Sequence, residues 1–313
     1  MEGIADKHQK TASNISNFLQ VFCISKLTQK NVDLFFNEFV RFDPLKKTQF
    51  ELSFKVREDI LNRGEIRLLN LDINTYSCRS QELYLLRLAA YKKIIYSRTH
   101  NPQKEKIFSI LESISNMPLD LYAGADIQDD NFLFAFWLIL GGVKKDGTIS
   151  YAKHAGKIFD KVFSAIGIKP RFAVRSRDIL NIGFDIGGKD IFYKIYYFLN
   201  KNTQQFVSEK ELEKTKKISA FLGSGKRHWF FISERYKIKK SAEKSIRKKI
   251  YLEFLDDILT KDKQTLDLLA GIFKIIGCPY GAADLKKFLG ALDARIAIIA
   301  FESDGTVTFY IRI

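Results

Sequence analysis

The sequence predicts an α+β protein with a closed antiparallel barrel of ten strands, built from repeated strand–strand–helix units and ringed by helices. Five consecutive pairs of segments alternate between apolar and polar residues, and most pairs are followed by apolar residues at helical spacing. Residues 124–127, Gly-Ala-Asp-Ile, are echoed at 183–186 as Gly-Phe-Asp-Ile, which indicates an internal repeat. Closure is expected because a flat sheet of ten strands leaves two exposed edges, whereas a barrel leaves none.

The chain is expected to form a single domain over residues 1–313, with N-terminal helices in 1–45 and the repeated units in 46–313. Apolar residues at helical spacing between 15 and 42 predict two short helices. The paired strands are predicted at 50–57 with 65–74, 119–128 with 131–141, 177–186 with 190–199, 227–237 with 245–254, and 295–302 with 306–312. The helices between them are predicted at 81–96, 104–115, 151–166, 208–222, 263–276 and 284–292.

Cysteine usage and hydropathy indicate a cytoplasmic protein without a membrane segment. Cys23, Cys78 and Cys278 lie far apart and the four histidines are scattered, so neither a disulfide framework nor a protein metal site is expected. The most apolar stretch, residues 132–143, is too short to span a bilayer. The first residues lack the apolar core of a signal peptide.

The chain is strongly basic, with a net charge of +15. Such a charge is compatible with binding to nucleic acid, to an anionic membrane or to a phosphorylated small molecule. The basic residues are spread along the whole chain rather than gathered in a tail or block, so a nucleic-acid or membrane partner is not expected.

Two motifs suggest other functions, but each lacks residues that its function requires. Residues 269–277 resemble the LAGLIDADG box of homing endonucleases, but Ile276 stands where the box needs a metal-binding acid. Residues 223–226, Gly-Ser-Gly-Lys, resemble part of a P-loop, which requires Gly in place of Ala220 and Ser or Thr in place of Arg227. We interpret the first as an amphipathic helix and the second as a helix end.

The strand predicted at 50–57 has one polar and one apolar face, because side chains of the same parity point the same way. Glu51, Ser53 and Lys55 share the polar face. The apolar face is expected to pack under the helices, which turns the polar face toward the barrel lumen. Cations and tyrosines repeat at this spacing on later strands: Lys194 with Tyr196, Arg247 with Lys249 and Tyr251, and Thr308 with Tyr310 and Arg312.

A lumen lined in this way suits an allylic diphosphate. Lys and Arg neutralise a diphosphate and Tyr hydroxyls donate hydrogen bonds to it. Aromatic faces stabilise the carbocation left when the diphosphate departs, and a carboxylate takes a proton from the nucleophile. The alternative is that these cations face outward and are solvated. The predicted diphosphate-binding residues on these strands are Lys55, Lys194, Tyr196, Lys249, Tyr251, Tyr310 and Arg312.

Residues 50–56 (Phe-Glu-Leu-Ser-Phe-Lys-Val), Arg67, and the Gly-x-Asp patterns within 121–127 and 181–186 resemble the aromatic prenyltransferase superfamily, whose fold is called ABBA or PT barrel. Within it the chain is most similar to the peptide prenyltransferases of cyanobactin biosynthesis. The resemblance implies that Glu51 is the base or the orienting carboxylate and that Arg67 binds diphosphate. It also implies Mg²⁺ held with the diphosphate, an isoprenyl diphosphate as donor and a peptide substrate.

We therefore predict a prenyltransferase that moves a dimethylallyl or geranyl group from its diphosphate to an aromatic or hydroxyl side chain of a linear or cyclic peptide. One feature departs from the family: residues 132–140 contain no Lys, Arg or His, although basic residues are expected on this strand. Two alternatives stay open. One is a non-catalytic basic protein of the same fold that binds nucleic acid or a peptide, and the other is an inactive relative.

Overall fold

A computed structural model describes most of the chain from residue 81 onward and a few earlier segments. The predicted N-terminal helices and the strand predicted at 65–74 lie largely outside the described residues; within them, 29–34 are helical and Ile66–Arg67 form a strand. No helix in the described ranges is long and apolar enough to cross a membrane. These ranges are 13, 15–16, 26, 29–34, 37, 51–56, 66–67, 81–102, 104–117, 119–128, 131–144, 148–167, 178–187, 190–225, 227–238, 247–290, 292–303 and 305–312.

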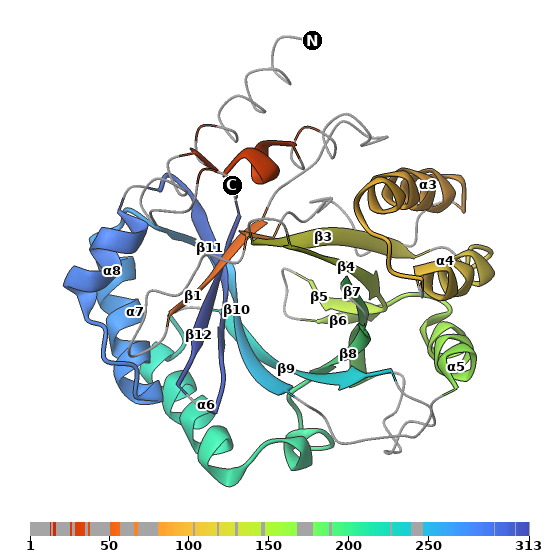
Figure 1. The fold of residues 1–313 in the computed structure, drawn as a ribbon. Coiled ribbons are helices and arrows are strands. Elements are labelled where there is room, and N and C mark those ends of the chain that lie inside the picture. The colour runs from red at the N-terminus through yellow and green to blue at the C-terminus, as the bar shows by residue number, and fades with distance from the viewer. Residues whose placement is uncertain are drawn as a thin grey trace.

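A large curled antiparallel sheet dominates the mixed α/β fold, and its strands wrap around a lumen (Figure 1). The strands are β1 (Glu51–Val56), β2 (Ile66–Arg67), β3 (Asp120–Gln128), β4 (Asn131–Ile139), β7 (Ile179–Gly187), β8 (Asp190–Phe198), β9 (His228–Lys237), β10 (Arg247–Leu259), β11 (Arg295–Phe301) and β12 (Val307–Arg312). They hydrogen-bond in the order β1-β12-β11-β10-β9-β8-β7-β4-β3-β2. The hairpins β3–β4, β7–β8, β9–β10 and β11–β12 pair as predicted.

The helices predicted between residues 81 and 292 are confirmed, with ends that differ by a few residues. They are α3 (Gln81–Arg98), α4 (Lys104–Ser113), α5 (Ala155–Ile166), α6 (Glu209–Leu222), α7 (Lys263–Ile276) and α8 (Ala282–Leu289), and they lie outside the curled sheet (Figure 1). α6 begins with a capping box, in which the Ser208 hydroxyl and the Glu211 carboxylate accept hydrogen bonds from each other's backbone N–H groups.

The two faces of the sheet differ in the way that the alternation of residues predicts. Apolar side chains on the outer face pack under the helices: the rings of Phe309 on β12 and Phe273 on α7 have centroids 5.5 Å apart. Phe136 on β4 meets Phe108 on α4 at the same separation. This layer forms the main core, and the opposite parity on each strand faces the lumen.

The sheet does not close as predicted. Among the described residues β1 pairs with β12 and β2 pairs with β3, whereas no ladder joins β1 to β2, although some of their Cα atoms come within 8 Å. The prediction of a closed ten-stranded barrel is therefore wrong in its closure, whereas most of the strand predicted at 65–74, and with it the predicted first hairpin, lies outside the described residues. β1 pairs through one edge with β12, and its other edge has no ladder to β2 among the described residues.

A second, small sheet was not predicted. β5 (Gly141–Val143) pairs with β6 (Ile149–Tyr151), and this hairpin lies within the ring of strands in Figure 1. It requires Gly at 141, because a Cβ there would lie 2.8 Å from Cδ1 of Tyr151. The strand predicted at 131–141 therefore ends at Ile139, and the sequence pair Asp146-Gly147 was the hairpin signal that could have predicted the turn.

Candidate functional site

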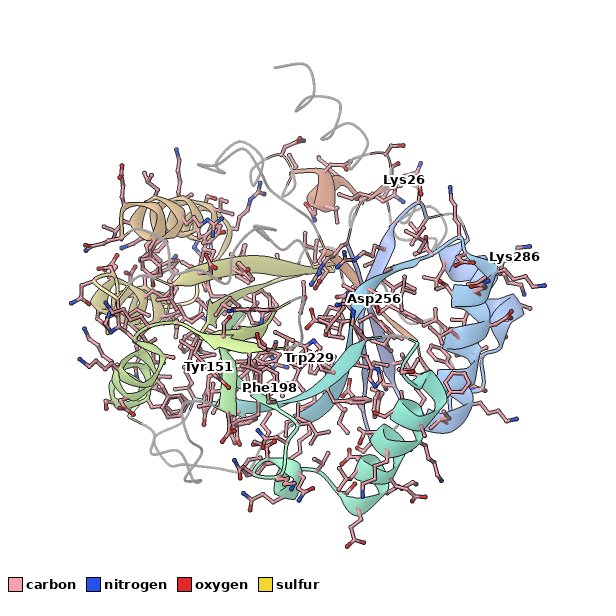
Figure 2. The ribbon with its side chains drawn as sticks, turned by 180° about the vertical axis from the view of Figure 1, so that it is seen from behind. Lys26, Tyr151, Phe198, Trp229, Asp256 and Lys286 are labelled. Carbon is pink, nitrogen blue, oxygen red and sulfur yellow. The ribbon has the colours of Figure 1, made fainter. Side chains whose placement is uncertain are left out.

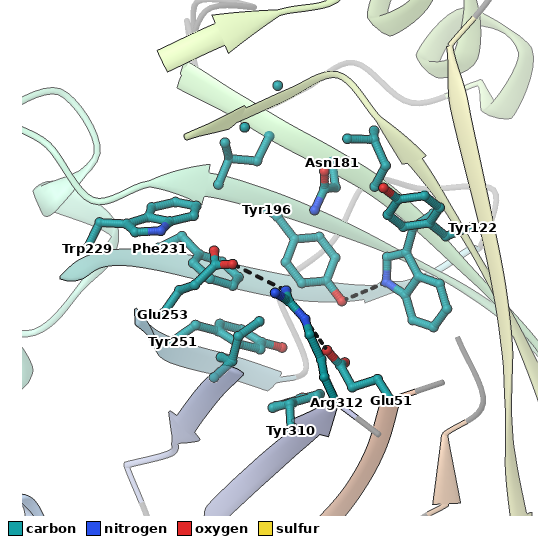
Figure 3. A pocket seen from close by; sticks show the side chains of 16 residues that line it. Glu51, Tyr122, Asn181, Tyr196, Trp229, Phe231, Tyr251, Glu253, Tyr310 and Arg312 are labelled. Carbon is teal, nitrogen blue, oxygen red and sulfur yellow. Dashed lines mark hydrogen bonds and ion pairs between the residues drawn. The ribbon is translucent and has the colours of Figure 1, made fainter. Parts of the chain in front are cut away.

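The lumen contains two neighbouring cavities of different character. The first, which we call the aromatic end, has a volume of about 160 Å³ and is shown in Figure 3. It is lined by Glu51, Tyr122, Trp137, Ile139, Gly141, Gly142, Leu180, Asn181, Tyr196, Trp229, Phe231, Tyr251, Glu253, Ile298, Tyr310 and Arg312. The second, which we call the ionic end, has a volume of about 80 Å³ and is lined by Asp126, Leu133, Asp185, Lys194, Ser233, Arg235, Arg247, Lys249, Tyr251 and Tyr310. Tyr251 and Tyr310 line both.

The rings of the aromatic end form a continuous wall. Phe231 and Tyr251 stack with centroids 4.4 Å apart, and Tyr251 lies 5.7 Å from Tyr196 and 5.9 Å from Tyr310. The wall continues outward, where Trp229 lies 4.8 Å from Phe198 (Figure 2). Such a wall presents π-faces that attract positive charge, so it can stabilise a carbocation while excluding water.

Two buried carboxylates flank one guanidinium at the aromatic end (Figure 3). Nε of Arg312 lies 3.8 Å from Oε2 of Glu51, and Nη2 of Arg312 lies 3.5 Å from Oε1 of Glu253. Both separations exceed those of close charge-assisted hydrogen bonds. Burial raises the pKa of Glu253, while Arg312 and then Arg295 oppose the shift.

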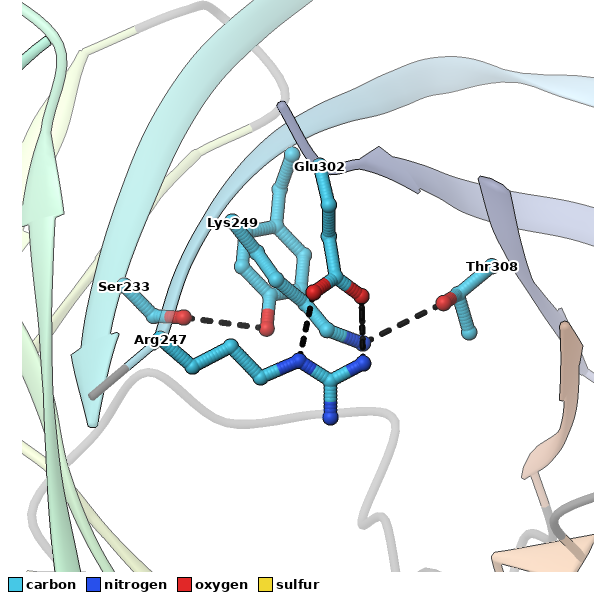
Figure 4. A network of polar contacts seen from close by, with 6 residues as sticks. Ser233, Arg247, Lys249, Glu302 and Thr308 are labelled. Atoms are coloured by element: carbon cyan, nitrogen blue, oxygen red, sulfur yellow. Dashed lines mark hydrogen bonds and ion pairs between the residues drawn. The ribbon is translucent and has the colours of Figure 1, made fainter. Parts of the chain in front are cut away.

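The ionic end is held by short contacts between charged side chains. Nζ of Lys194 lies 2.8 and 2.7 Å from the two carboxylate oxygens of Asp185, and Nη2 of Arg235 lies 3.1 Å from Oδ2 of the same residue. On the neighbouring strand β10, the Arg247 guanidinium binds both oxygens of Glu302, which follows β11 (Figure 4).

Lys249 joins this second group. Its ammonium donates to the hydroxyl of Thr308 at 3.2 Å and lies 3.5 Å from Glu302 (Figure 4). The neighbouring Ser233 hydroxyl donates to the Tyr251 hydroxyl at 3.2 Å. The ionic end therefore adjoins the tyrosines that border the aromatic end.

The structure brings most of the predicted site residues to the lumen. Glu51, Tyr196, Tyr251, Tyr310 and Arg312 line the aromatic end, and Lys194 and Lys249 line the ionic end. Their roles stay predictions. Arg312 was predicted to bind diphosphate, but it lies with Glu51 and Glu253 rather than with the other cations.

The side chains of Lys55 and Arg67 lie outside what the structure describes. Their backbones are placed: Lys55 is opposite Thr308 on β12, and Arg67 is opposite Asp126 on β3. Directly opposed residues share a face of the sheet, and Thr308 and Asp126 belong to the lumen side, so both positions fall on that side.

Apart from Glu51, sequence reasoning missed the carboxylates of the lumen, and it missed one arginine. Asp126 and Asp185 belong to the repeated Gly-x-Asp pattern, which was used as a sign of repetition and not as a site. Glu253 has the parity of Lys249 and Tyr251, so alternation could have found it. Arg235 and Glu302 could be located only once the pairing of their strands was known.

The described residues do not fit a protein-held Mg²⁺. They contain no group of three or more His, Cys, Asp or Glu side chains that could hold a metal ion. One carboxylate of the ionic end, Asp185, already contacts Lys194 and Arg235 through its oxygens. Mg²⁺ needs oxygen ligands in octahedral geometry, and ammonium and guanidinium groups compete with it for those oxygens.

Comparison with known proteins identifies the fold. No protein-family model and no curated protein sequence matches the chain. Its structure is similar to that of AnaPT from Neosartorya fischeri, with a TM-score of 0.57 and 13% sequence identity, over 96% of this chain and 91% of that one. The likeness concerns the fold alone: the chain has the ABBA-type fold of the aromatic prenyltransferase AnaPT.

Proposed function

We propose that the protein transfers an isoprenyl group from an allylic diphosphate to an aromatic acceptor. The observation that carries the proposal is the construction of the lumen, in which buried cations adjoin a wall of aromatic rings and a buried carboxylate. The similarity to AnaPT supports the same class of reaction. In finer detail, we propose that the donor is dimethylallyl or geranyl diphosphate. The acceptor is an aromatic or hydroxyl side chain of a linear or cyclic peptide.

The two ends of the lumen divide the reaction between them. Lys194, Lys249 and Arg247 would bind the diphosphate, whose departure takes both electrons of the bond between its oxygen and C1 of the isoprenyl group. Tyr251 and Tyr310, which border both ends, would screen the resulting allylic cation. The acceptor then forms a bond to C1 with its own electron pair, and the proton it loses passes to Glu51.

Mg²⁺ enters the proposal only through the diphosphate. Diphosphate oxygens are the hard ligands that Mg²⁺ prefers, and they need no carboxylate of the chain. The steps above therefore use the cations of the chain and derive nothing from a metal ion.

One observation favours the alternative of an inactive relative. Each cation that the structure describes at the ionic end has a carboxylate nearby: Asp185 for Lys194 and Arg235, and Glu302 for Arg247 and Lys249. A diphosphate has to replace these carboxylates as the partner of the cations. β4, which carries no cation, contributes nothing to offset that cost.

Mass spectrometry of turnover tests the proposal directly. The protein is incubated with dimethylallyl or geranyl diphosphate and matched peptides that carry Tyr, Trp, Ser or Thr, each linear and cyclic. We expect a mass increase of one isoprenyl group on an aromatic peptide, with Lys286→Met on the outer helix α8 as a control that retains it (Figure 2). Donor binding without any adduct would favour the inactive relative, and absence of donor binding would contradict the proposal.

A further inference from the structure

Four side chains on β9 and β10 form one corner of the aromatic end. Trp229 stands directly opposite Glu253, and Phe231 stands directly opposite Tyr251, so all four share the lumen face of the sheet. The rings of Trp229 and Phe231 have centroids 5.0 Å apart, and Phe231 stacks on Tyr251 at 4.4 Å. One carboxylate thus shares a corner of the cavity with three aromatic rings, and we call these four residues the cage.

The carboxylate of the cage is buried but weakly paired. The exposed fraction of Glu253 is 9%, and within the described ranges its one hydrogen bond or ion pair joins Oε1 to Nη2 of Arg312 at 3.5 Å. Its second oxygen, Oε2, can therefore accept a hydrogen bond from a ligand in the cavity that Glu253 lines. Burial raises the pKa of Glu253 although Arg312 and Arg295 oppose the shift, so these two guanidinium groups do not replace the water that the carboxylate has lost.

The lining of the aromatic end carries more negative than positive charge. Among the described residues that line it, Glu51, Glu253 and Arg312 are the charged ones, so one carboxylate is in excess when both are ionised. Glu51 lies on one side of the Arg312 guanidinium, and Glu253 lies with Trp229 on the other (Figure 3). The cavity can therefore hold the reacting ring of an acceptor near Glu51 and a second, positively charged group near Glu253.

We propose that the cage binds a cationic nitrogen of the acceptor, so that the preferred acceptor is an aromatic ring with an ammonium group a short chain away. Ammonium groups are attracted to the faces of aromatic rings and form charge-assisted hydrogen bonds with carboxylates, and the cage offers both. An aromatic residue at the N-terminus of a linear peptide carries such a group, whereas the same residue within a cyclic peptide does not. The inference rests on the proposed function for the place of the acceptor in the reaction, and it narrows the acceptor to a cationic one.

Calorimetry with two phenols of nearly equal size tests the cage without turnover. Tyramine carries an ammonium group where tyrosol carries a hydroxyl group. We expect the wild-type protein to bind tyramine about tenfold more tightly than tyrosol, as for one charge-assisted hydrogen bond. Equal affinities, tighter binding of tyrosol, or binding of neither phenol would overturn the inference.

Two variants separate the carboxylate of the cage from its rings, and tyrosol binding checks that each variant is folded. Glu253→Gln keeps the size of the side chain and removes its charge, so tyramine and tyrosol should bind about equally. Trp229→Leu keeps every charge and removes one π-face, so the affinity for tyramine should fall about threefold to tenfold, and more than that for tyrosol. A preference for tyramine that survives in Glu253→Gln would place the cation elsewhere and overturn the inference.

Glu213→Gln is the matched control for the loss of charge. Glu213 lies on the outer helix α6, in an exposed pair with Lys217. The substitution changes the net charge by the same amount as Glu253→Gln does, and the variant should bind both phenols as the wild type does. A loss of the tyramine preference in Glu213→Gln would show that net charge, and not the cage, sets the preference.

Competition between two linear peptides extends the test to the proposed reaction. Both peptides begin with Tyr, one with its free ammonium group and the other N-acetylated, and mass spectrometry measures which receives the isoprenyl group. We expect the wild type to favour the free peptide about tenfold and Glu253→Gln to favour neither. Equal prenylation of both by the wild type would overturn the inference and leave the proposed function intact. Preferential binding of tyramine without prenylation of any peptide would instead contradict the proposed function and leave the cage intact.

Discussion

The aromatic and ionic ends of the lumen are built from the same strands but hold their charges differently. β10 supplies Arg247 and Lys249 to the ionic end and Glu253 to the aromatic end, with Tyr251 between them. At the ionic end, Asp185 contacts its cations at 2.7 to 3.1 Å, whereas the ion contacts of Arg312 span 3.5 and 3.8 Å.

This difference indicates what each end is prepared to do. Close pairs fix cations in place before a ligand arrives, and the ligand must then compete with their carboxylates. Loosely paired carboxylates can turn to a new hydrogen-bond donor at smaller cost. The ionic end is thus organised in advance, and the aromatic end is left to adapt to an acceptor.

The largest expected effect concerns Glu51. Glu51→Gln should lower the rate of prenyl transfer by about 10²–10⁴, because it removes the base. The melting temperature is measured on the same variant, because Glu51 also contacts Arg312 at 3.8 Å. Glu112→Gln, which breaks an exposed pair with Lys92 on the outer helices, is the control for both readouts. Normal turnover in a destabilised Glu51→Gln protein would show that Glu51 is a structural partner instead.

Replacing Asp185 tests the ionic end by stability. Asp185→Asn leaves Lys194 and Arg235 without the close carboxylate that they share, and removing one partner of a buried ion pair costs about 3–5 kcal/mol. The melting temperature should fall, and added inorganic diphosphate should raise it more than in the wild type because the ligand takes the place of the carboxylate. An equal increase in both proteins would mean that diphosphate binds elsewhere.

A single cation at the ionic end should have a smaller effect. Lys249→Met, or Arg67→Met on β2, should raise the dissociation constant of the donor about tenfold, as the loss of one charge-assisted contact predicts. Lys274→Met, at the end of the outer helix α7, provides a control at the same change of net charge. Unchanged donor affinity in both lumen variants would place the diphosphate away from these side chains.

Alternation of residues was enough to predict which face of each strand meets the lumen and which neighbouring strands form hairpins, but not how strands far apart in the sequence pair. It identified Glu51, Lys194, Tyr196, Lys249, Tyr251 and Tyr310, since these share parity with their polar neighbours. The pairing of β1 with β12 joins opposite ends of the chain, and no local pattern encodes it. This pairing places Arg312 beside Glu51. The sequence alone does not reveal that neighbour, so it could not test the role predicted for Arg312 at the diphosphate.

The smallest expected effect is the pH dependence that Glu253 gives to stability. Burial raises the pKa of Glu253 above its ordinary 4.5 in the folded state. The folded state therefore binds the proton of Glu253 more tightly than the unfolded state does. The stability that this protonation contributes is fully present below the ordinary pKa and is lost as pH rises through the raised pKa. Glu253→Gln should not lose stability in this way. The melting temperature of the variant, relative to that of the wild type, should therefore increase as pH rises. Glu213, whose pKa is lowered by Lys217, provides a control of opposite sign, because its contribution is lost as pH falls. A Glu253→Gln protein that follows the wild-type melting profile would mean that Arg312 fully compensates the burial, and the aromatic end would then be as tightly paired as the ionic one.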